Sequence, residues 1–587
     1  MIKTDGGTFY LTAGEACYIF KIDGGALRHV HFGKRVEPED DLTALGFGSE
    51  NWSELGGATF ARDGKPIAVK LEYGGAQVLA DKPAPDRPAL GGGKTLVIDM
   101  RDYKAALRVK LYYTPYPRGG FSRRVEIYND GSKSVTLTAP PQTVTLAREY
   151  DIISVGDNGE KRRTPVGKYS DGGNALTNFI AAAKPTASES HGDVYGFLCA
   201  YGDGAVHATT DGAATVITCD DGANGTEIAA GGVYTLPEAL AVYSDSGVGG
   251  MSRILHDVLR ENSGERIDGK RRPTVLYSPI MSVDKMCEAA GTACELGCDV
   301  FAVDCGEASA DAIKAVAEAC KAAGIKFGVR VSPVALGKSS AAYIKESVKA
   351  KNGKFAVDMS DDRSVEAFIA ALQNVIADCD AEYLMIDIER GGVKPFAVGM
   401  WRVRGALAAR FPELVIEWGA VPTEMLIGQS LCYPPCLMRN AVAATPSDSL
   451  KTRFDIATFG CLGYELDPTE ATDELKRAIR AQIFSYQDDA PATLNGDLYR
   501  LSAADGDVCL MSVAKDKSRA YAVCIRTHAS KTSVRLLGLD EHNIYHIREL
   551  NKTFSGAALM YCGVSVPPAC GEKTTFVLHL RQVADYE

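Results

Sequence analysis

The chain has 587 residues, of which 46% are hydrophobic and 24% are charged, as in a globular protein of about three domains. Its net charge of −11 argues against nucleic acid or an anionic membrane as a partner, because both attract basic surfaces. No apolar run is long enough for a transmembrane helix, and the N-terminal sequence lacks a basic region followed by an apolar segment. We therefore expect a cytoplasmic protein with no membrane segment.

The 16 cysteines are scattered through helix-like and strand-like segments. We interpret them as reduced, buried, small apolar residues. The pairs Cys294–Cys298 and Cys432–Cys436 lack the spacing and the second pair of a zinc site, and the 9 histidines form no HExxH motif. The sequence therefore predicts neither a metal nor a cofactor.

Residues 1–250 carry short alternating runs that Gly, Asp and Asn turns interrupt, with no long segment of helical period. This pattern is typical of half-buried strands, so it predicts a large N-terminal antiparallel β-sandwich. The helical pattern GGMSRILHDVLR (249–260) follows, and then a charged stretch (264–273) that ends in a proline. We assign 251–273 to a linker helix and domain junction.

From Thr274 to about residue 487, apolar strand patterns alternate with helical ones. The predicted strands lie in TVLYSPIM (274–281), DVFAVDCG (299–306), KFGVRVSP (326–333), EYLMIDIER (382–390) and LVIEWGAV (414–421). The predicted helices lie in KMCEAAGTACELG (285–297), DAIKAVAEACKAAG (311–324), AAYIKESVKAK (341–351), VEAFIAALQNVIADC (365–379) and WRVRGALAARF (401–411). Repeated βα units predict a (β/α)8-type barrel over 274–487, complete or short of one βα unit.

Residues 488–587 return to strand patterns and predict a C-terminal antiparallel β-sandwich. The runs are CLMSVAK (509–515), AYAVCIRT (520–527), SVRLLGL (533–539) and TTFVLHL (574–580). The predicted fold class is thus multidomain α/β plus all-β, with a barrel between two sandwiches. Such an architecture does not by itself give a function.

The stretch AEYLMIDIER (381–390) joins an apolar run to a cluster of charged residues. An apolar run of this kind is typical of a buried parallel strand, and its C-terminal charges would then lie at the mouth of the barrel, where catalytic residues of such barrels are placed. We hypothesise that Asp387 lies at the centre of a sugar-binding pocket. The alternative is that Asp387 caps the following helix or pairs with Arg390.

Six distinctive stretches stand in order along the chain. They are ALRHVHFGK (26–34), VYSDSGVGGMS (242–252), YPP (433–435), GYELD (463–467), GDLYRL (496–501) and LGLD (537–540). With them the chain resembles glycoside hydrolase family 36, the retaining α-galactosidases, over all three predicted domains. The resemblance implies a carbohydrate substrate and an Asp nucleophile at the end of the fourth barrel strand, which is Asp387 here.

The surroundings of Asp387 depart from the family's pattern. Met385-Ile386-Asp387 stands in place of Lys-Trp-Asp, so the Lys that helps to hold sugar hydroxyls is lost. Strand two reads DCGE (304–307) in place of paired aspartates before Gly-Trp, and strand three reads RVSP (330–333) in place of a Trp and a Glu-Pro. Strand five leads into EWGA (417–420) rather than a Cys- and Gly-rich loop with an Arg. By position, the candidates for binding substrate are Asp304, Cys305, Glu307, Arg330, Glu389, Arg390, Trp418 and Tyr277.

Three of these candidates also have ordinary structural interpretations. Arg330 either binds an anionic group or forms an ion pair with Asp387 or Asp304. Trp418 either stacks on a sugar ring or packs in the wall of the barrel. Cys305 has no histidine positioned to activate it, so a small strand-end residue is favoured over a catalytic thiol.

The family's acid/base Asp has no counterpart here. It belongs to a βα unit before Tyr-Pro-Pro, and residues 421–431 are too few for a strand, an active-site loop and a helix. Retaining hydrolysis needs a second carboxyl group beside the nucleophile. Glu424 and Glu417 are the first candidates, with Glu307 and Glu389 behind them, and for each the alternative is a solvated or ion-paired Glu.

Three functions follow as hypotheses. The first is an α-galactosidase-like glycosidase with a remodelled sugar subsite. The second is a weak or inactive relative that binds carbohydrate, and the third is a structural protein that binds a partner through its sandwich surface. Retention of Asp387 and Asp304 favours the first two, whereas loss of the acid/base unit favours the last two. The sequence leaves the monomer and a homo-oligomer both open.

Overall fold

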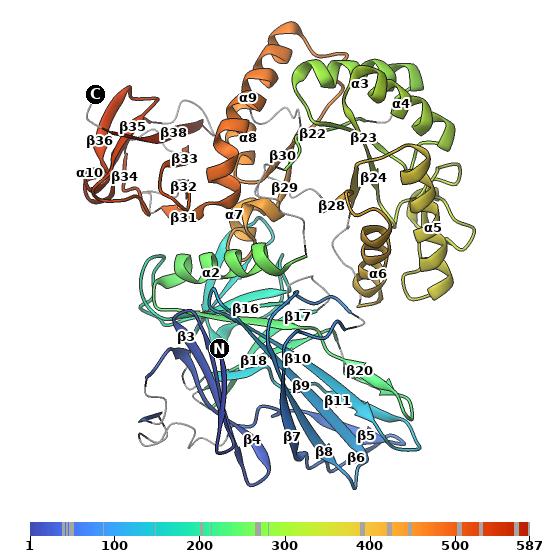
Figure 1. The fold of residues 1–587 in the computed structure, drawn as a ribbon, viewed down its shortest axis with the longest axis vertical. Helices are drawn as coiled ribbons and strands as arrows, with labels where there is room; N and C mark the ends of the chain where they lie inside the picture. The colour runs from blue at the N-terminus through green and yellow to red at the C-terminus, as the bar shows by residue number, and fades with distance from the viewer. Residues whose placement is uncertain are drawn as a thin grey trace. The chain divides into compact units, whose positions relative to one another are not determined.

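The computed structural model describes residues 1–37, 41–42, 45, 52–85, 87–146, 148, 150–199, 204–212, 214–222, 224–264, 272–279, 281–387, 394–419, 425–443, 449–501, 507–526, 532–568 and 574–584. The chain forms two compact units (Figure 1). The first comprises residues 1–265, 393–398 and 427–433, and the second comprises residues 266–392, 399–426 and 434–587. No helix in the described ranges is long and apolar enough to cross a membrane.

The first unit is built from antiparallel sheets, as its alternating sequence predicts. One sheet joins β1 (Ile2–Asp5), β2 (Thr8–Ala13), β3 (Ala16–Asp23) and β4 (Ala26–Lys34). The largest has the order β14 (Lys161–Pro165), β13 (Asp151–Val155), β15 (Phe179–Ala183), β16 (Val194–Cys199), β21 (Ala239–Ser244), β10 (Gly120–Asn129), β9 (Leu107–Tyr116), β8 (Thr95–Asp102), β7 (Glu72–Leu79), with β20 (Val233–Thr235) beside β10. The smaller sheets join β19 (Thr226–Ile228), β11 (Val135–Ala139), β5 (Thr59–Arg62) and β6 (Lys65–Ile67), and β12 (Val144–Leu146), β18 (Ala214–Asp220) and β17 (Ala205–Asp211).

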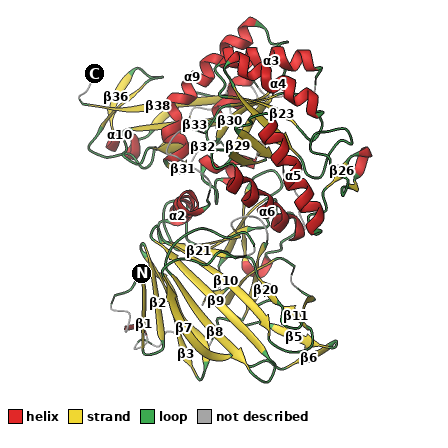
Figure 2. Cartoon of the chain, turned by 45° about the vertical axis from the view of Figure 1, so that its right-hand side comes forward, coloured by secondary structure: helices red, strands yellow, loops and turns green. Residues whose placement is uncertain are grey.

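The long strands β7 to β10 lie side by side in one layer of this unit (Figure 2). Inward-facing side chains from several of the sheets form one apolar core, to which Leu11, Phe20, Leu96, Leu111 and Phe197 belong. Burying this shared surface is what holds the sheets together, because each strand buries only part of its own surface. The all-β prediction for the N-terminal part is confirmed.

Helix α2 (Gly247–Asn262) follows β21 within the first unit. Its buried apolar residues recur at spacings of three and four, as an amphipathic helix requires. The hydroxyl of Ser252 donates to the carbonyl oxygen of Leu431 at 2.8 Å, and Nε2 of His256 lies 2.9 Å from that of Ser430. The short connection 427–433 is therefore held on α2.

The second unit contains a sheet of parallel strands. Its order is β28 (Val415–Trp418), β27 (Tyr383–Ile386), β24 (Lys326–Val331), β23 (Val300–Asp304), β22 (Val275–Tyr277), β30 (Cys461–Glu465) and β29 (Arg439–Ala443). All neighbours in this order are parallel. The described part of the sheet has seven strands, one fewer than a complete eight-stranded barrel, which is one of the two alternatives that the sequence left open. β28 and β29 are its two edge strands.

Helices connect these strands. They are α3 (Val283–Leu296), α4 (Ala310–Ala323), α5 (Asp362–Asp378), α6 (Lys394–Arg410), α7 (Leu426–Gln429), α8 (Leu450–Ala457) and α9 (Asp473–Asn495). The side chains of Ser282, Ser309 and Asp361 accept backbone N–H groups at the starts of α3, α4 and α5. Gly297 and Gly324 end α3 and α4 with positive φ angles, a conformation that glycine adopts without strain.

The helix predicted over 341–351 is wrong. This segment forms turns and the short strand β25 (Val348–Lys349), which pairs with β26 (Phe355–Ala356). The backbone N–H groups of Ala341 and Ala342 donate to the carbonyl oxygens of Ala308 and Cys305, at 2.9 and 3.0 Å. Tertiary backbone hydrogen bonds to the loop after β23 therefore replace the local bonds of a helix.

The C-terminal part of the second unit is a six-stranded antiparallel sheet with a two-stranded one. The larger has the order β31 (Asp497–Leu501), β32 (Val508–Val513), β33 (Arg519–Arg526), β38 (Thr574–Val583), β35 (Ile544–Ile547) and β36 (Lys552–Ser555). The smaller pairs β34 (Thr532–Val534) with β37 (Val564–Val566), and α10 (Gly556–Tyr561) follows β36. An apolar core that includes Met511, Ala522, Tyr545 and Leu578 confirms the predicted C-terminal β architecture.

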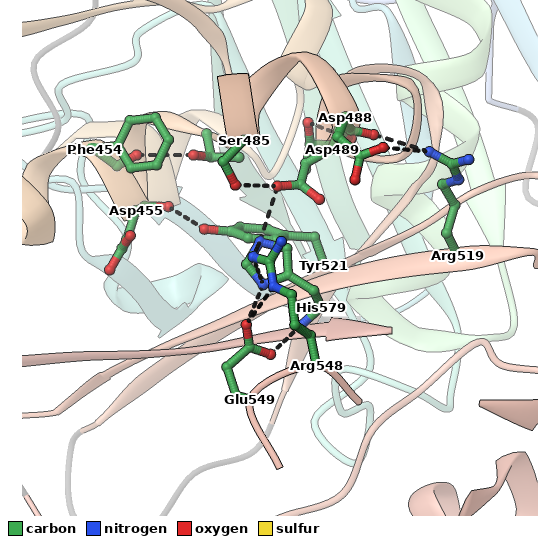
Figure 3. A network of polar contacts seen from close by, with 12 residues as sticks. Phe454, Asp455, Ser485, Asp488, Asp489, Arg519, Tyr521, Arg548, Glu549 and His579 are labelled. Carbon is green, nitrogen blue, oxygen red and sulfur yellow. Dashed lines mark hydrogen bonds and ion pairs between the residues drawn. The ribbon is translucent and has the colours of Figure 1, made fainter. Parts of the chain in front are cut away.

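A polar network joins this sheet to α8 and α9 (Figure 3). His579 of β38 lies between two carboxylates, with Nε2 3.0 Å from Asp489 of α9 and Nδ1 2.6 Å from Glu549. Tyr521 of β33 stacks edge-on against His579 and donates to the carbonyl oxygen of Asp455 in α8 at 3.5 Å. The barrel helices and the C-terminal sheet therefore meet through charged as well as apolar contacts.

Candidate active site at the C-terminal ends of the barrel strands

The sheet register brings four charged residues to one face. Asp304 and Arg330 are direct neighbours on β23 and β24, and Arg330 is the neighbour of Met385 on β27. Asp387 lies two residues beyond Met385, so strand alternation gives it the same side. Glu465 ends β30 beside Tyr277, whose ring belongs to the apolar core inside the sheet. Because the carboxyl ends of parallel strands lie at one edge, these side chains meet at the mouth of the barrel.

Arg330 connects two of the carboxylates. Its Nε lies 2.5 Å from Oδ2 of Asp387, and its Nη1 lies 3.0 Å from Oε1 of Glu465. The guanidinium also lies 5.9 Å from the ring centre of Tyr277. Burial lowers the pKa of Arg330, but the carboxylates of Asp387 and Glu465 outweigh this effect and raise it above its ordinary value. The predicted ion pair between Arg330 and Asp387 is confirmed.

Asp387 keeps one carboxylate oxygen available. Its backbone N–H donates to the carbonyl oxygen of Val331 at 2.9 Å, which fixes the start of the loop after β27. Only Oδ2 bonds to Arg330; within the described ranges Oδ1 has no hydrogen-bond partner. The side chain is 21% exposed.

Asp304 has a different environment. Its Oδ1 accepts the backbone N–H of Gly306 at 2.8 Å, and no described cation forms an ion pair with it. Burial raises the pKa of Asp304 to about 6, and the charges of Glu307 and Asp387 add to the rise, while the Gly306 hydrogen bond and Arg330 act against it. Asp387 and Glu465 are thus paired with a cation at the mouth, whereas the half-buried carboxyl of Asp304 has no such partner among the described residues.

Glu307 and Cys305 are placed less centrally. Glu307 is exposed and pairs with Lys354 at 2.8 Å. Cys305 is fully buried, and strand alternation gives it the side opposite Asp304. Burial raises the pKa of its thiol, so the thiol stays protonated and does not face the charged cluster. The interpretation of Cys305 as a small strand-end residue fits this position.

Glu417, a candidate acid/base, is buried inside the sheet rather than exposed at its mouth. Nε and Nη2 of Arg439 lie 2.6 and 2.5 Å from its Oε2, and the hydroxyl of Tyr383 donates to the same oxygen at 2.6 Å. The hydroxyl of Tyr277 lies 2.7 Å from that of Tyr383. This placement makes Glu417 part of a buried polar core that joins edge strands β28 and β29, and it argues against an acid/base role.

The remaining predicted residues divide into two groups. Trp418 is the neighbour of Ile386 in the register, on the side opposite Met385, which fits packing in the wall better than stacking on a sugar at the mouth. Glu389, Arg390 and Glu424 lie outside the described residues. In the described ranges, no group of three or more His, Cys, Asp or Glu side chains is arranged to hold a metal ion.

Two family models match the chain. One, described as Melibiase, matches residues 419–496, and the other, described as the Glycosyl hydrolase family 36 C-terminal domain, matches residues 507–580. α-Galactosidase AgaA of Geobacillus stearothermophilus is 24% identical over 98% of this chain and 98% of its own. α-Galactosidase Mel36A of Lactobacillus acidophilus is 22% identical over the same shares. The two models and these nearly full-length relatives support membership of glycoside hydrolase family 36.

Solved structures of family 36 have the same fold. The α-galactosidase AgaB of Geobacillus stearothermophilus superposes with a TM-score of 0.86 at 22% identity, covering 99% of this chain and 100% of that one. The galactosidase domain of AgaSK gives 0.86 at 21% identity, covering 99% and 100%. The enzyme class that the relatives support is that of O-glycosyl hydrolases.

Within family 36 this chain is short. Its alignment with AgaA runs over 721 positions, more than the 587 residues present here, so the relative carries segments that this chain lacks. Sequence reasoning did not assign Glu465, although a charge at the end of the apolar strand CLGYE was the available signal.

Proposed function

We propose that this chain is a retaining glycosidase for an α-linked galactoside or a related glycoside, with Asp387 as its nucleophile. The observation that carries the proposal is the position of Asp387 at the mouth, with Oδ2 held by Arg330 and Oδ1 without a hydrogen-bond partner in the described ranges. In the first step Oδ1 attacks the anomeric carbon and the bond to the leaving group breaks, which gives a glycosyl ester. In the second step water cleaves the ester and releases the sugar.

The sugar subsite is remodelled in this proposal. Arg330 spans from Asp387 to Glu465 above Tyr277, on the strand where the family has a Trp. Met385 provides no positive charge to hold sugar hydroxyls, and Cys305 is buried. We therefore expect a preference for a sugar other than unmodified α-galactose, or weak turnover of simple α-galactosides.

A second candidate function has one observation in its favour. The Arg330 guanidinium is bonded to Asp387 and Glu465 at the same time, so the candidate nucleophile already has a cationic partner at the mouth. A relative that binds carbohydrate weakly, without turnover, would show this arrangement. The alternatives differ in a measurable way, because only the first forms a covalent intermediate.

The test compares two aryl α-galactosides, one with a nitrophenol-type leaving group and one with a poor leaving group. Asp387→Asn should lower kcat roughly a thousandfold or more, because an amide is not a nucleophile. Asp311→Asn, on the exposed first turn of α4, is the matched control and should leave kcat unchanged. A variant of AgaA has been crystallised with raffinose and another with stachyose, so both sugars are included as substrates.

Trapping decides between the two candidate functions. A 2-fluoro glycoside with a good leaving group should add the mass of one sugar to the wild-type chain and none to Asp387→Asn. Saturable sugar binding with no turnover and no added mass would refute the glycosidase and support the binding protein.

A further inference from the structure

The mouth of the barrel contains a second carboxyl group suited to proton transfer. This inference rests on the proposed function, because retaining hydrolysis needs both a nucleophile and a proton donor. The described carboxyl groups near Asp387 are those of Asp304, Glu307, Glu417 and Glu465. Their environments differ enough to choose among them.

Three of the four have partners that oppose the role. Glu417 is buried inside the sheet and bonded to Arg439 and Tyr383, away from the mouth. Glu307 is exposed and paired with Lys354, and Glu465 is bonded to Arg330. All three carboxyl groups are therefore engaged by a cationic side chain, whereas a general acid has to be free to reach the glycosidic oxygen of the substrate.

We propose that Asp304 is the proton donor and acceptor of this site. It ends β23 in register with Arg330, on the side of the sheet that carries Asp387. Oδ1 accepts the Gly306 N–H, and Oδ2 has no partner among the described residues, so Oδ2 can carry the proton. The backbone N–H of Cys305 donates to the carbonyl oxygen of Arg330 at 2.8 Å and fixes Asp304 relative to β24.

Electrostatics supports this assignment. The charged groups facing Asp304 are Arg330 on β24, Glu307 beyond its own strand and Asp387 after β27. Burial and the two carboxylates raise the pKa of Asp304 to about 6, so it is protonated in half of the molecules near pH 6. A pair of carboxyl groups whose environments differ in this way is the arrangement that separates an acid from a nucleophile.

Asp304 donates a proton in the first step and accepts one in the second. The Oδ2 proton of Asp304 moves to the glycosidic oxygen as the bond to the anomeric carbon breaks, and Oδ1 of Asp387 forms an ester with that carbon. The leaving group departs as a neutral alcohol. The Asp304 carboxylate then takes a proton from water, whose oxygen attacks the anomeric carbon and breaks the ester. Asp387 returns as a carboxylate and Asp304 as an acid, at the cost of one water molecule.

The test uses a series of aryl α-glycosides that differ only in the acidity of the leaving phenol. Asp304→Asn keeps the acceptor for the Gly306 N–H but cannot donate an acidic proton. Its kcat/KM should fall roughly 100-fold or more with poor leaving groups and little with nitrophenol-type ones. The wild-type loss of kcat/KM above about pH 6 should vanish in the variant. In Asp304→Ala, azide should restore turnover and give a glycosyl azide of retained configuration.

Glu465→Gln is the matched variant at the same mouth and should show neither azide rescue nor a steeper dependence on the leaving group. Replacing a residue that only contacts a sugar hydroxyl lowers kcat/KM equally for all leaving groups. An equal loss for all leaving groups in Asp304→Asn would therefore overturn the proposal. If Glu465→Gln showed the steep dependence of kcat/KM on the leaving group, and Asp304→Asn lowered kcat/KM equally for all leaving groups, the proton-donor role would belong to Glu465. No turnover by the wild-type chain would instead overturn the proposed glycosidase, and this assignment with it.

Discussion

Replacing Arg439 by methionine should destabilise the second unit by about 3–5 kcal/mol, the cost of leaving a buried charge without its partner. Arg439 and Glu417 expose only 1% and 7% of their side chains. Removal of the guanidinium leaves Glu417 with the Tyr383 hydroxyl at 2.6 Å and the more distant Arg272 at 4.0 Å. It also removes the donor of two hydrogen bonds, to the carbonyl oxygens of Leu462 and Pro273, and each of these bonds is worth about 1 kcal/mol.

The double variant tests the reasoning. Arg439→Met with Glu417→Leu replaces the ion pair by apolar side chains, so it should recover most of the loss and give a coupling free energy of at least about 2 kcal/mol. Arg402→Met is the matched control, because Arg402 pairs with Asp362 at the surface with 39% of its side chain exposed. This control should cost less than about 1 kcal/mol.

Urea unfolding followed by tryptophan fluorescence is the assay. The chain has 3 tryptophans, and Trp401 on α6 and Trp418 on β28 both belong to the second unit. A loss of 3–5 kcal/mol corresponds to a fall in Tm of roughly 5–8 °C for a unit of this size. A loss below about 1 kcal/mol for Arg439→Met, or a double variant no better than the single one, would refute the view that this ion pair joins the two edge strands.

Two further predictions concern other parts of the chain. His579→Gln should cost about 1.5–3 kcal/mol near pH 6, because hydrogen bonds to Asp489 and Glu549 raise the pKa of His579 despite its burial. This stabilisation is complete below the pKa of about 6.5 that histidine has in the unfolded chain, and it is lost as the pH rises through the higher pKa of the folded state. The difference in Tm between the variant and the wild type should therefore shrink toward pH 9. A difference in Tm that stays constant with pH would contradict the role of the His579 charge. Gly247→Ala should destabilise the first unit by about 1–3 kcal/mol, because Gly247 has a φ of +71° and an added Cβ would lie 2.5 Å from a backbone carbonyl oxygen. Gly291→Ala, whose Cβ would meet nothing within 4 Å in α3, should instead be neutral or stabilising in the same thermal melts.

The order of strands and helices followed from local patterns. Apolar runs such as YLMI and the period of VEAFIAALQNVIADC are set by which residues are buried, and β27 and α5 form where those patterns stand. The number of barrel strands did not follow: the sequence left a complete barrel and one short of a βα unit both open, and the described part of the sheet has seven strands. The segment 341–351 failed because backbone bonds to the loop after β23 outweighed a weak helical preference.

The sequence by itself determined the family resemblance, the succession of β, α/β and β regions, and the placing of Asp387 at a strand end. The tertiary structure decided which charges meet. Arg330 and Glu465 are 135 residues apart in the chain, and no local pattern shows that one guanidinium joins Glu465 to Asp387. Glu417 and Asp304 are both strand carboxyl groups, yet one is paired inside the sheet and the other is without a described ion-pair partner at its mouth. The reason is physical: periodicity records only which residues are buried, whereas pairing and pKa depend on strand order, register and depth, which exist only in the folded chain.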